Sequence, residues 1–360
     1  MKFSLLYLPT YWPELNGSVA RLYGDMLDEI EFADQNGFNS VWFAEHHFHR
    51  YGGVIPSVPV IAAAAAQRTR RLRIGSSVAL IGLNDPVRVA EEFAMLDNLS
   101  GGRVDFGIGR AFQHIEYEAF EVPMDESRAR FDEAHEIILK AWADGPVTHA
   151  GKFRTLKNVD VIPKPVQRPH PPIYVACIMT PESFAFTGGR GYNLMYVPYV
   201  GNAEDGAARV KSYRDALGRA GHDLATHDVM MCLHTFIGES PSHARDYPRP
   251  YLTNYFELAA AANRVDAQSA QYQGYAGLGK VFQRLHENYE LMYPNQVIFG
   301  DPEQTLARIA HYEAMGATHL SLITNFGGMP HGEIMRSLER FVKQVMPHVK
   351  PTPQSAAAGR

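Results

Sequence analysis

Eight short apolar runs, separated by longer runs of mixed polar and apolar residues, predict that this 360-residue chain is an α/β protein folded as a (β/α)₈ or TIM barrel. Polar residues also gather where several of these runs end, and barrels carry their ligand sites at the carboxyl ends of the strands. A doubly wound sheet is the alternative, because strands are difficult to count from sequence. The predicted strands span residues 3–7, 40–44, 72–80, 104–108, 173–176, 193–197, 229–237 and 319–323.

The segments between these strands carry helix signals at their ends. Residues 22–35 are followed by Asn36-Gly37, which favours a helix stop, and Pro86 suits the first turn of a helix over residues 86–99. The predicted helices span residues 22–35, 59–67, 86–99, 128–143, 181–189, 203–220, 240–262, 301–315 and 333–345.

Two regions interrupt the alternation. Residues 109–127 lack clear periodicity and residues 145–172 are rich in Pro, Lys and Val, whereas residues 264–296 form a second irregular stretch. Long irregular loops in compact enzymes are often lids. We therefore expect one domain over residues 1–350 with insertions after strands four and seven, followed by a disordered tail at residues 351–360.

Composition narrows the class of protein. Hydrophobic residues make up 46% of the chain and charged residues 20%, which is typical of a globular protein with a substantial core. The net charge of −5, without a Lys/Arg block, argues against nucleic acid or an anionic membrane as partner. Two cysteines without metal-ligand spacing, no signal-peptide pattern and no membrane-spanning run lead us to expect a cytoplasmic location.

A carboxylate and two imidazoles, Glu45-His46-His47, end the second predicted strand. Neighbouring strand residues point to opposite faces, so only one histidine can face a given pocket. A pair of structural histidines is an equally good interpretation at this point. Adjacent side chains that point in opposite directions cannot bind one metal ion together, and the chain has no His-Glu-x-x-His motif. We therefore predict no metal.

The ends of the fourth and fifth strands favour an anion. Arg110 follows the fourth strand, Arg128 begins a helix, and Thr180 precedes a helix that starts at Pro181. A helix N-terminus with a hydroxyl cap offers N–H groups and a positive dipole to a phosphate. Simple capping with two surface arginines is the alternative. Gly107-Ile108-Gly109 lacks the third glycine of a dinucleotide fingerprint, and no G-x-S-x-G elbow occurs.

Several motifs, in this order, resemble the bacterial luciferase-like flavin monooxygenases, and the resemblance runs through most of residues 1–350. The matching motifs are Glu45–Phe48, Ile74–Val78, Asp85–Arg88, Leu99–Arg103, Phe106–Arg110, Ser127–Arg128, Thr180–Ser183 and Gly300–Glu303. The resemblance implies a (β/α)₈ barrel that binds reduced FMN non-covalently, with a flavin reductase as the partner that supplies it. It also implies a homodimer, with residues 59–67 and 86–99 as candidate contact helices.

The resemblance assigns roles to matching residues. His46 matches a general acid or base beside the flavin ring, and Ser77-Val78 matches a non-proline cis peptide against that ring. Arg110 and Arg128 match residues on the phosphate side, and residues 264–296, with Lys280, match a lid. The remaining candidates for cofactor contact are Cys177, Met179, Thr180, Glu182 and Ser183.

Departures from the family pattern argue against light emission and a long-chain aldehyde substrate. Gly109 stands where the luciferase α subunit has a reactive cysteine, and Cys177-Ile178 replace an acidic residue and a serine. The predicted function is an FMN-dependent monooxygenase that oxygenates a small organic substrate with O₂ through a flavin 4a-hydroperoxide. The alternatives are a deazaflavin-dependent hydride-transfer oxidoreductase of the same fold and a non-catalytic subunit of a luciferase-like heterodimer.

Overall fold

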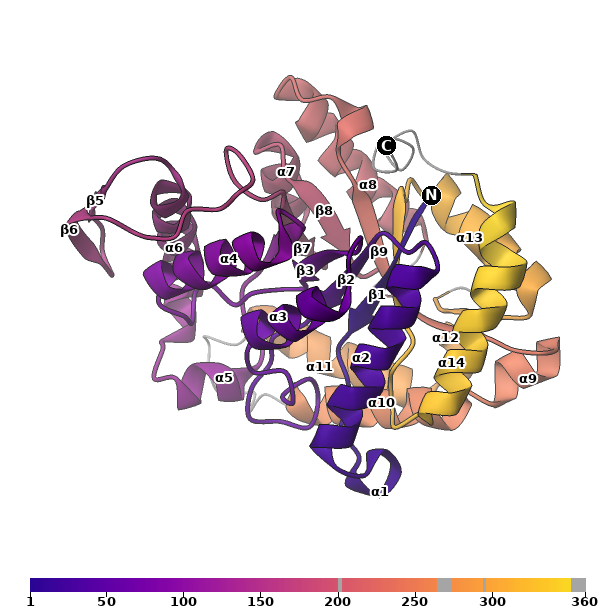
Figure 1. The fold of residues 1–360 in the computed structure, drawn as a ribbon. Coiled ribbons are helices and arrows are strands. Elements are labelled where there is room, and N and C mark those ends of the chain that lie inside the picture. The colour runs from indigo at the N-terminus through magenta and orange to yellow at the C-terminus, as the bar shows by residue number, and fades with distance from the viewer. Residues whose placement is uncertain (200–202, 264–272, 294–295, 351–360) are drawn as a thin grey trace.

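The computed structural model describes residues 1–199, 203–263, 273–293 and 296–350 (Figure 1). The predicted tail, residues 351–360, and the first part of the predicted lid, residues 264–272, lie outside the described residues.

Eight parallel strands close into a barrel, which confirms the predicted (β/α)₈ fold. Each strand pairs with its neighbour in the order β1-β2-β3-β4-β7-β8-β9-β11, and β11 returns to β1, so the sheet has no open edge as a doubly wound sheet would. The barrel strands are β1 (Lys2–Tyr7), β2 (Ser40–Phe43), β3 (Arg73–Ser76), β4 (Val104–Ile108), β7 (Ile173–Cys177), β8 (Asn193–Tyr196), β9 (Val229–Ile237) and β11 (His319–Ile323).

Helices surround this barrel, as Figure 1 shows for α2, α3, α4, α8, α13 and α14. Their ends follow local chemistry: the Asp85 carboxylate accepts the N–H groups of Val87 and Arg88 at the start of α4, and Gly101, at φ 68°, ends it. The helices that follow the barrel strands include α1 (Pro13–Asn16), α2 (Val19–Gln35), α3 (Val58–Arg68), α4 (Pro86–Ser100), α6 (Ser127–Trp142), α7 (Pro181–Gly189), α8 (Ala203–Arg219), α13 (Pro302–Ala314) and α14 (His331–Arg340).

The first insertion follows β4, as predicted, but is more regular than expected. It contains the short helix α5 (His114–Ala119) before α6, and a hairpin of β5 (Val147–Ala150) and β6 (Thr155–Val159) after it. No helix was predicted over residues 114–119, because six residues are too few to show an amphipathic period.

The second insertion follows β9 and contains α9 (Pro241–Asp246), α10 (Arg249–Ala262), α11 (Gln273–Glu287), α12 (Tyr289–Met292) and the short strand β10 (Ile298–Gly300), which pairs with the end of β9. The prediction of an irregular stretch was wrong for residues 273–287, which form a helix. Leu278, Phe282 and Leu285 are buried at helical spacing, and α11 packs along α10.

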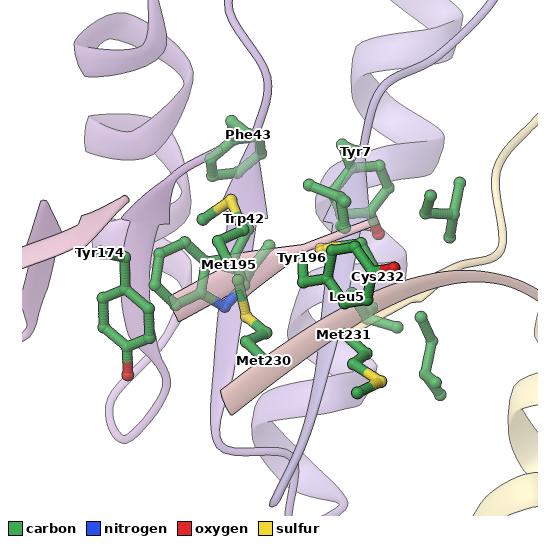
Figure 2. Packing of buried hydrophobic residues seen from close by; sticks show 14 of the residues in the cluster. Leu5, Tyr7, Trp42, Phe43, Tyr174, Met195, Tyr196, Met230, Met231 and Cys232 are labelled. Carbon is green, nitrogen blue, oxygen red and sulfur yellow. The ribbon is translucent and has the colours of Figure 1, made fainter. Parts of the chain in front are cut away.

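Large side chains fill the barrel interior. The Trp42 ring lies 4.7 Å from that of Tyr174, and Figure 2 shows both with Met195 and Met230 among the buried residues. A methyl group on Gly75 would lie 2.1 Å from Trp42 Cε3, so glycine at this position allows the indole to fit. The packed interior leaves ligands only the barrel mouth, at the carboxyl ends of the strands.

Candidate functional site

A cavity opens where β4 and β7 end, between these strand ends and helices α6, α7 and α11. It encloses about 840 Å³ of empty space, part of which is open to solvent. Apolar side chains form most of its wall, and two arginines and two hydroxyls are the polar side chains. The lining residues are Gly109, Arg110, Phe112, Arg128, Phe131, Val175, Ala176, Ile178, Met179, Thr180, Ser183, Phe186 and Leu278. This arrangement suits a ligand with an apolar body and an anionic group.

The two arginines differ in how their charge is used. Arg110 makes no ion pair or hydrogen bond with the residues that the structure describes, so its charge is available to a ligand. Arg128 Nε lies 2.9 Å from Asp132 Oδ2, its side chain is about half exposed, and its guanidinium lies 5.1 Å over the Phe186 ring. Arg110 is therefore the stronger candidate for binding an anion.

The start of α7 has free donors. The prediction that the Thr180 hydroxyl caps this helix was wrong: that hydroxyl shares a hydrogen bond with the Ser183 hydroxyl at 2.7 Å, and no side chain caps the helix. Pro181 contributes no N–H. The Ser183 N–H already donates to the Thr180 carbonyl at 3.0 Å, so the Glu182 N–H and the proton of one of the two hydroxyls remain available to an oxyanion.

Beside the cavity, the chain that follows β3 packs closely against the end of β4. The Ser77–Val78 peptide bond is cis, as the family resemblance implied. A methyl group on Gly109 would lie 2.5 Å from Val78 Cγ2, so a cysteine at position 109 would require the Val78 side chain to shift. The Ser77 hydroxyl donates to Met195 Sδ at 3.0 Å, which directs that serine into the barrel.

His46 lies beside the cavity in a buried polar network. The imidazole is 4% exposed, and its ring centroid is 5.4 Å from that of Phe112, which lines the cavity, and 5.5 Å from that of Tyr51. Its Nδ1 lies 2.9 Å from Glu116 Oε1 and 2.9 Å from Gln113 Nε2. Its Nε2 has no hydrogen-bond partner within the described part of the chain, so this atom is available for proton transfer.

His47 points elsewhere, in agreement with the expected divergence. Its Nε2 lies 3.2 Å from Glu45 Oε1, and its ring packs edge-on against Phe120. Glu45 also accepts the N–H of Leu80 at 3.0 Å, so it ties the end of β2 to the loop after β3. Among residues 1–199, 203–263, 273–293 and 296–350, no group of three His, Cys, Asp or Glu side chains could hold a metal ion.

Five predicted site residues are not among those that line the cavity: His46, Ser77, Val78, Cys177 and Glu182. Cys177 Sγ lies 3.3 Å from Thr187 Oγ1 of α7, and burial raises the pKa of this thiol to about 12, so it stays neutral and faces the helix. Glu182 has an exposed side chain in the first turn of α7. Lys280 is likewise exposed on α11, whereas Leu278 of the same helix lines the cavity.

Sequence interpretation missed Gln113 and Glu116. Both side chains are fully buried, and both contact His46 from the insertion after β4. Their three-residue spacing at the start of α5 is the one signal that places them on the same side, and it is too short to be specific.

Comparisons with known proteins agree with this geometry. The family model of luciferase-like monooxygenases matches residues 1–319. The oxygenase component of the flavin-dependent trigonelline monooxygenase of Acinetobacter baylyi is 29% identical over 334 residues, which is 91% of this chain and 90% of that protein. The crystal structure of monooxygenase RslO1 from Streptomyces bottropensis has a TM-score of 0.85 and 33% identity, covering 97% of this chain and 99% of that one.

The fold also occurs with another coenzyme. An F420-dependent secondary alcohol dehydrogenase, in complex with an F420-acetone adduct, has a TM-score of 0.71 at 18% identity, covering 97% of this chain and 99% of that one. That likeness concerns the fold alone.

No helix in the described ranges is long and apolar enough to cross a membrane. From the match over residues 1–319, the chain belongs to the luciferase-like monooxygenase family.

Proposed function

We propose that this protein is an FMN-dependent monooxygenase that uses reduced FMN and O₂ to oxygenate a small organic substrate. The observation that carries the proposal is the unpaired Arg110 beside the uncapped start of α7, in a cavity that adjoins His46. Bound reduced FMN would supply the electrons that activate O₂.

The cavity has groups that fit each end of FMN. Arg110, Arg128 and the hydroxyls of Thr180 and Ser183 would hold the phosphate, with Met179 beside them. In this proposal the flavin ring lies toward the Ser77–Val78 peptide and Gly109, which lines the cavity without a side chain. The side chains of Cys177 and Glu182 have no part in it.

The residues around the proposed ring position have two tasks. Phe112, Ile178 and Leu278 are apolar and keep water from the reacting atoms, which strengthens the electrostatic interactions there. His46 holds or moves a proton at Nε2, the ring nitrogen that is free of partners within the described residues. The fully buried network around His46 argues against a non-catalytic subunit.

Two partners are part of the proposal. A flavin reductase would supply the reduced FMN, in keeping with a relative that is named an oxygenase component. A second copy of this chain would cover the α3–α4 surface, where Val60, Met95 and Leu99 are 72%, 56% and 47% exposed.

A deazaflavin coenzyme is the second candidate, because an F420-dependent enzyme shares the fold. Arg128 and Phe186 also line an adjoining groove, where the carboxylates of Asp132, Glu133 and Glu136 stand beside the cations of Arg128, Lys140 and Arg190. The charge of this groove favours neither coenzyme, so a binding experiment must distinguish them.

Anaerobic titration distinguishes the candidates. We expect saturable binding of reduced FMN and, on admission of O₂, substrate-dependent oxygen consumption, with at least tenfold weaker binding of the reduced deazaflavin coenzyme. Stronger binding of the deazaflavin, together with hydride transfer and no oxygen consumption, would favour the second candidate. Absence of saturable binding by either coenzyme would contradict both.

A further inference from the structure

A fully buried carboxylate lies beside His46 without the partners that burial normally requires. Glu116 is 0% exposed; its Oε1 accepts the main-chain N–H of His47 at 3.1 Å and faces His46 Nδ1 at 2.9 Å. Its Oε2 and the Oε1 of Gln113 are both buried without a hydrogen-bond partner in the described chain. Leaving such oxygens unpaired costs about 1–3 kcal/mol each, so this arrangement is a poor way to stabilise the fold.

The hydrogen bonds around Nδ1 decide which ring nitrogen of His46 carries the proton. The Glu116 Oε1 contact needs a proton on Nδ1, because a carboxylate is an acceptor only. Gln113 Nε2 lies 2.9 Å from the same Nδ1 atom. An amide NH₂ group is a donor, so this contact would need a lone pair on Nδ1. Turning the Gln113 amide by half a turn removes this conflict, because its oxygen then accepts from Nδ1–H as well.

We propose that Glu116 is a positioning residue that fixes neutral His46 as the Nδ1–H tautomer, so that the lone pair lies on Nε2, the ring nitrogen without a hydrogen-bond partner in the described chain. The main-chain N–H of His47 orients the carboxylate, and Gln113 adds a second acceptor. His46 then acts first as a proton acceptor at Nε2, and Glu116 stabilises the imidazolium that forms. The proposal rests on the proposed function for the role of His46, but not for its tautomer.

The experiment measures the ring nitrogens directly in flavin-free protein. ¹⁵N-histidine NMR, at a pH where imidazoles are neutral and with His46 assigned through His46→Gln, reports which nitrogen is protonated. Wild-type protein is expected to show His46 protonated at Nδ1. Glu116→Gln should keep this tautomer, because the carbonyl that accepts the His47 N–H also faces Nδ1.

Glu116→Met removes the hydrogen-bond acceptor but keeps a side chain of similar size. Gln113 is then free to donate to Nδ1, so the tautomer population of His46 should move toward the Nε2–H form. Glu118→Gln is the matched control: it removes a carboxylate from the same helix whose side chain is 72% exposed and ion-pairs with His114. It should leave the His46 signals unchanged.

Wild-type protein with His46 protonated at Nε2 overturns the proposal, and this result needs no variant to fold. Retention of the Nδ1–H tautomer in a folded Glu116→Met protein overturns it too. In the flavin-loaded enzyme, Glu116→Met should lower kcat on the order of 100-fold while the Kd for reduced FMN changes little. If the tautomer is as expected but FMN does not bind, the proposed function fails and the positioning role stands.

Discussion

His46 and His234 are two buried histidines near the carboxyl ends of barrel strands, and their surroundings are opposite. His46 has a carboxylate and an amide at one ring nitrogen and adjoins the cavity. His234, on β9, is 0% exposed, and both of its ring nitrogens lack hydrogen-bond partners in the described residues. Aromatic rings surround it, with the Tyr255 centroid at 4.3 Å and that of Phe326 at 5.1 Å.

The difference shows what burial alone does to an imidazole. Burial lowers the pKa of His234 to about 3, so this ring stays neutral and behaves as one more aromatic core residue. His46 is almost as buried, but the Glu116 carboxylate beside Nδ1 can stabilise a positive ring. We infer that the neighbouring carboxylate, more than depth in the barrel, makes a histidine at this end suitable for proton transfer.

The largest effect should come from removing His46. His46→Ala is expected to lower kcat about 100- to 10,000-fold, the usual contribution of a general acid or base, with little change in the Kd for reduced FMN. Steady-state kinetics and anaerobic titration measure the two quantities separately. His234→Leu is the comparison and should keep kcat within about threefold, since a neutral core ring takes part in no proton transfer. Equal losses of kcat and FMN affinity in His46→Ala would mark His46 as structural.

The two arginines extend the comparison to the phosphate end. Arg110→Met should weaken reduced FMN binding by about 10- to 100-fold. The charge of Arg110 is not shared with any carboxylate of the described residues, so all of its attraction acts on the ligand. Arg128→Met should weaken it less, because Asp132 already neutralises that charge and solvent screens it. Anaerobic titration of both variants measures the difference. A larger loss for Arg128 would contradict the assignment of Arg110 as the main anion ligand.

A third effect concerns the stability of the protein in acid and not its activity. A histidine whose pKa is about 3 when folded and 6.5 when unfolded binds its proton only in the unfolded chain between these values. The free energy of unfolding should therefore fall with decreasing pH in this window, by up to about 1.4 kcal/mol per pH unit from this residue. His234→Leu should remove that part of the slope in urea unfolding at several pH values. An unchanged slope would show that His234 ionises in the folded protein.

The sequence predicted most of the barrel, because its strands have uninterrupted apolar runs and its helices have clear stops. It missed β10, which has only three residues, and α11, whose buried Leu278, Phe282 and Leu285 alternate with glycines and polar residues. Both features depend on contacts with β9 and α10 that the local pattern does not contain.

The site was predictable where it depends on position along a strand and not where it depends on tertiary contact. Arg110 and Thr180 follow strand ends and do line the cavity. Cys177 also lies at a strand end, but its thiol faces α7, whereas its neighbours Val175, Ala176 and Ile178 line the cavity. Glu116 lies 70 residues after His46, and their contact follows only from the folding of α5 over the end of β2.

The structure of the protein with FMN bound tests the account most directly. The account predicts the phosphate within hydrogen-bond distance of Arg110 and the Thr180–Ser183 hydroxyls, and the flavin ring against the Ser77–Val78 peptide with His46 Nε2 facing it. A phosphate bound away from Arg110, or a ring bound out of reach of His46, would contradict it.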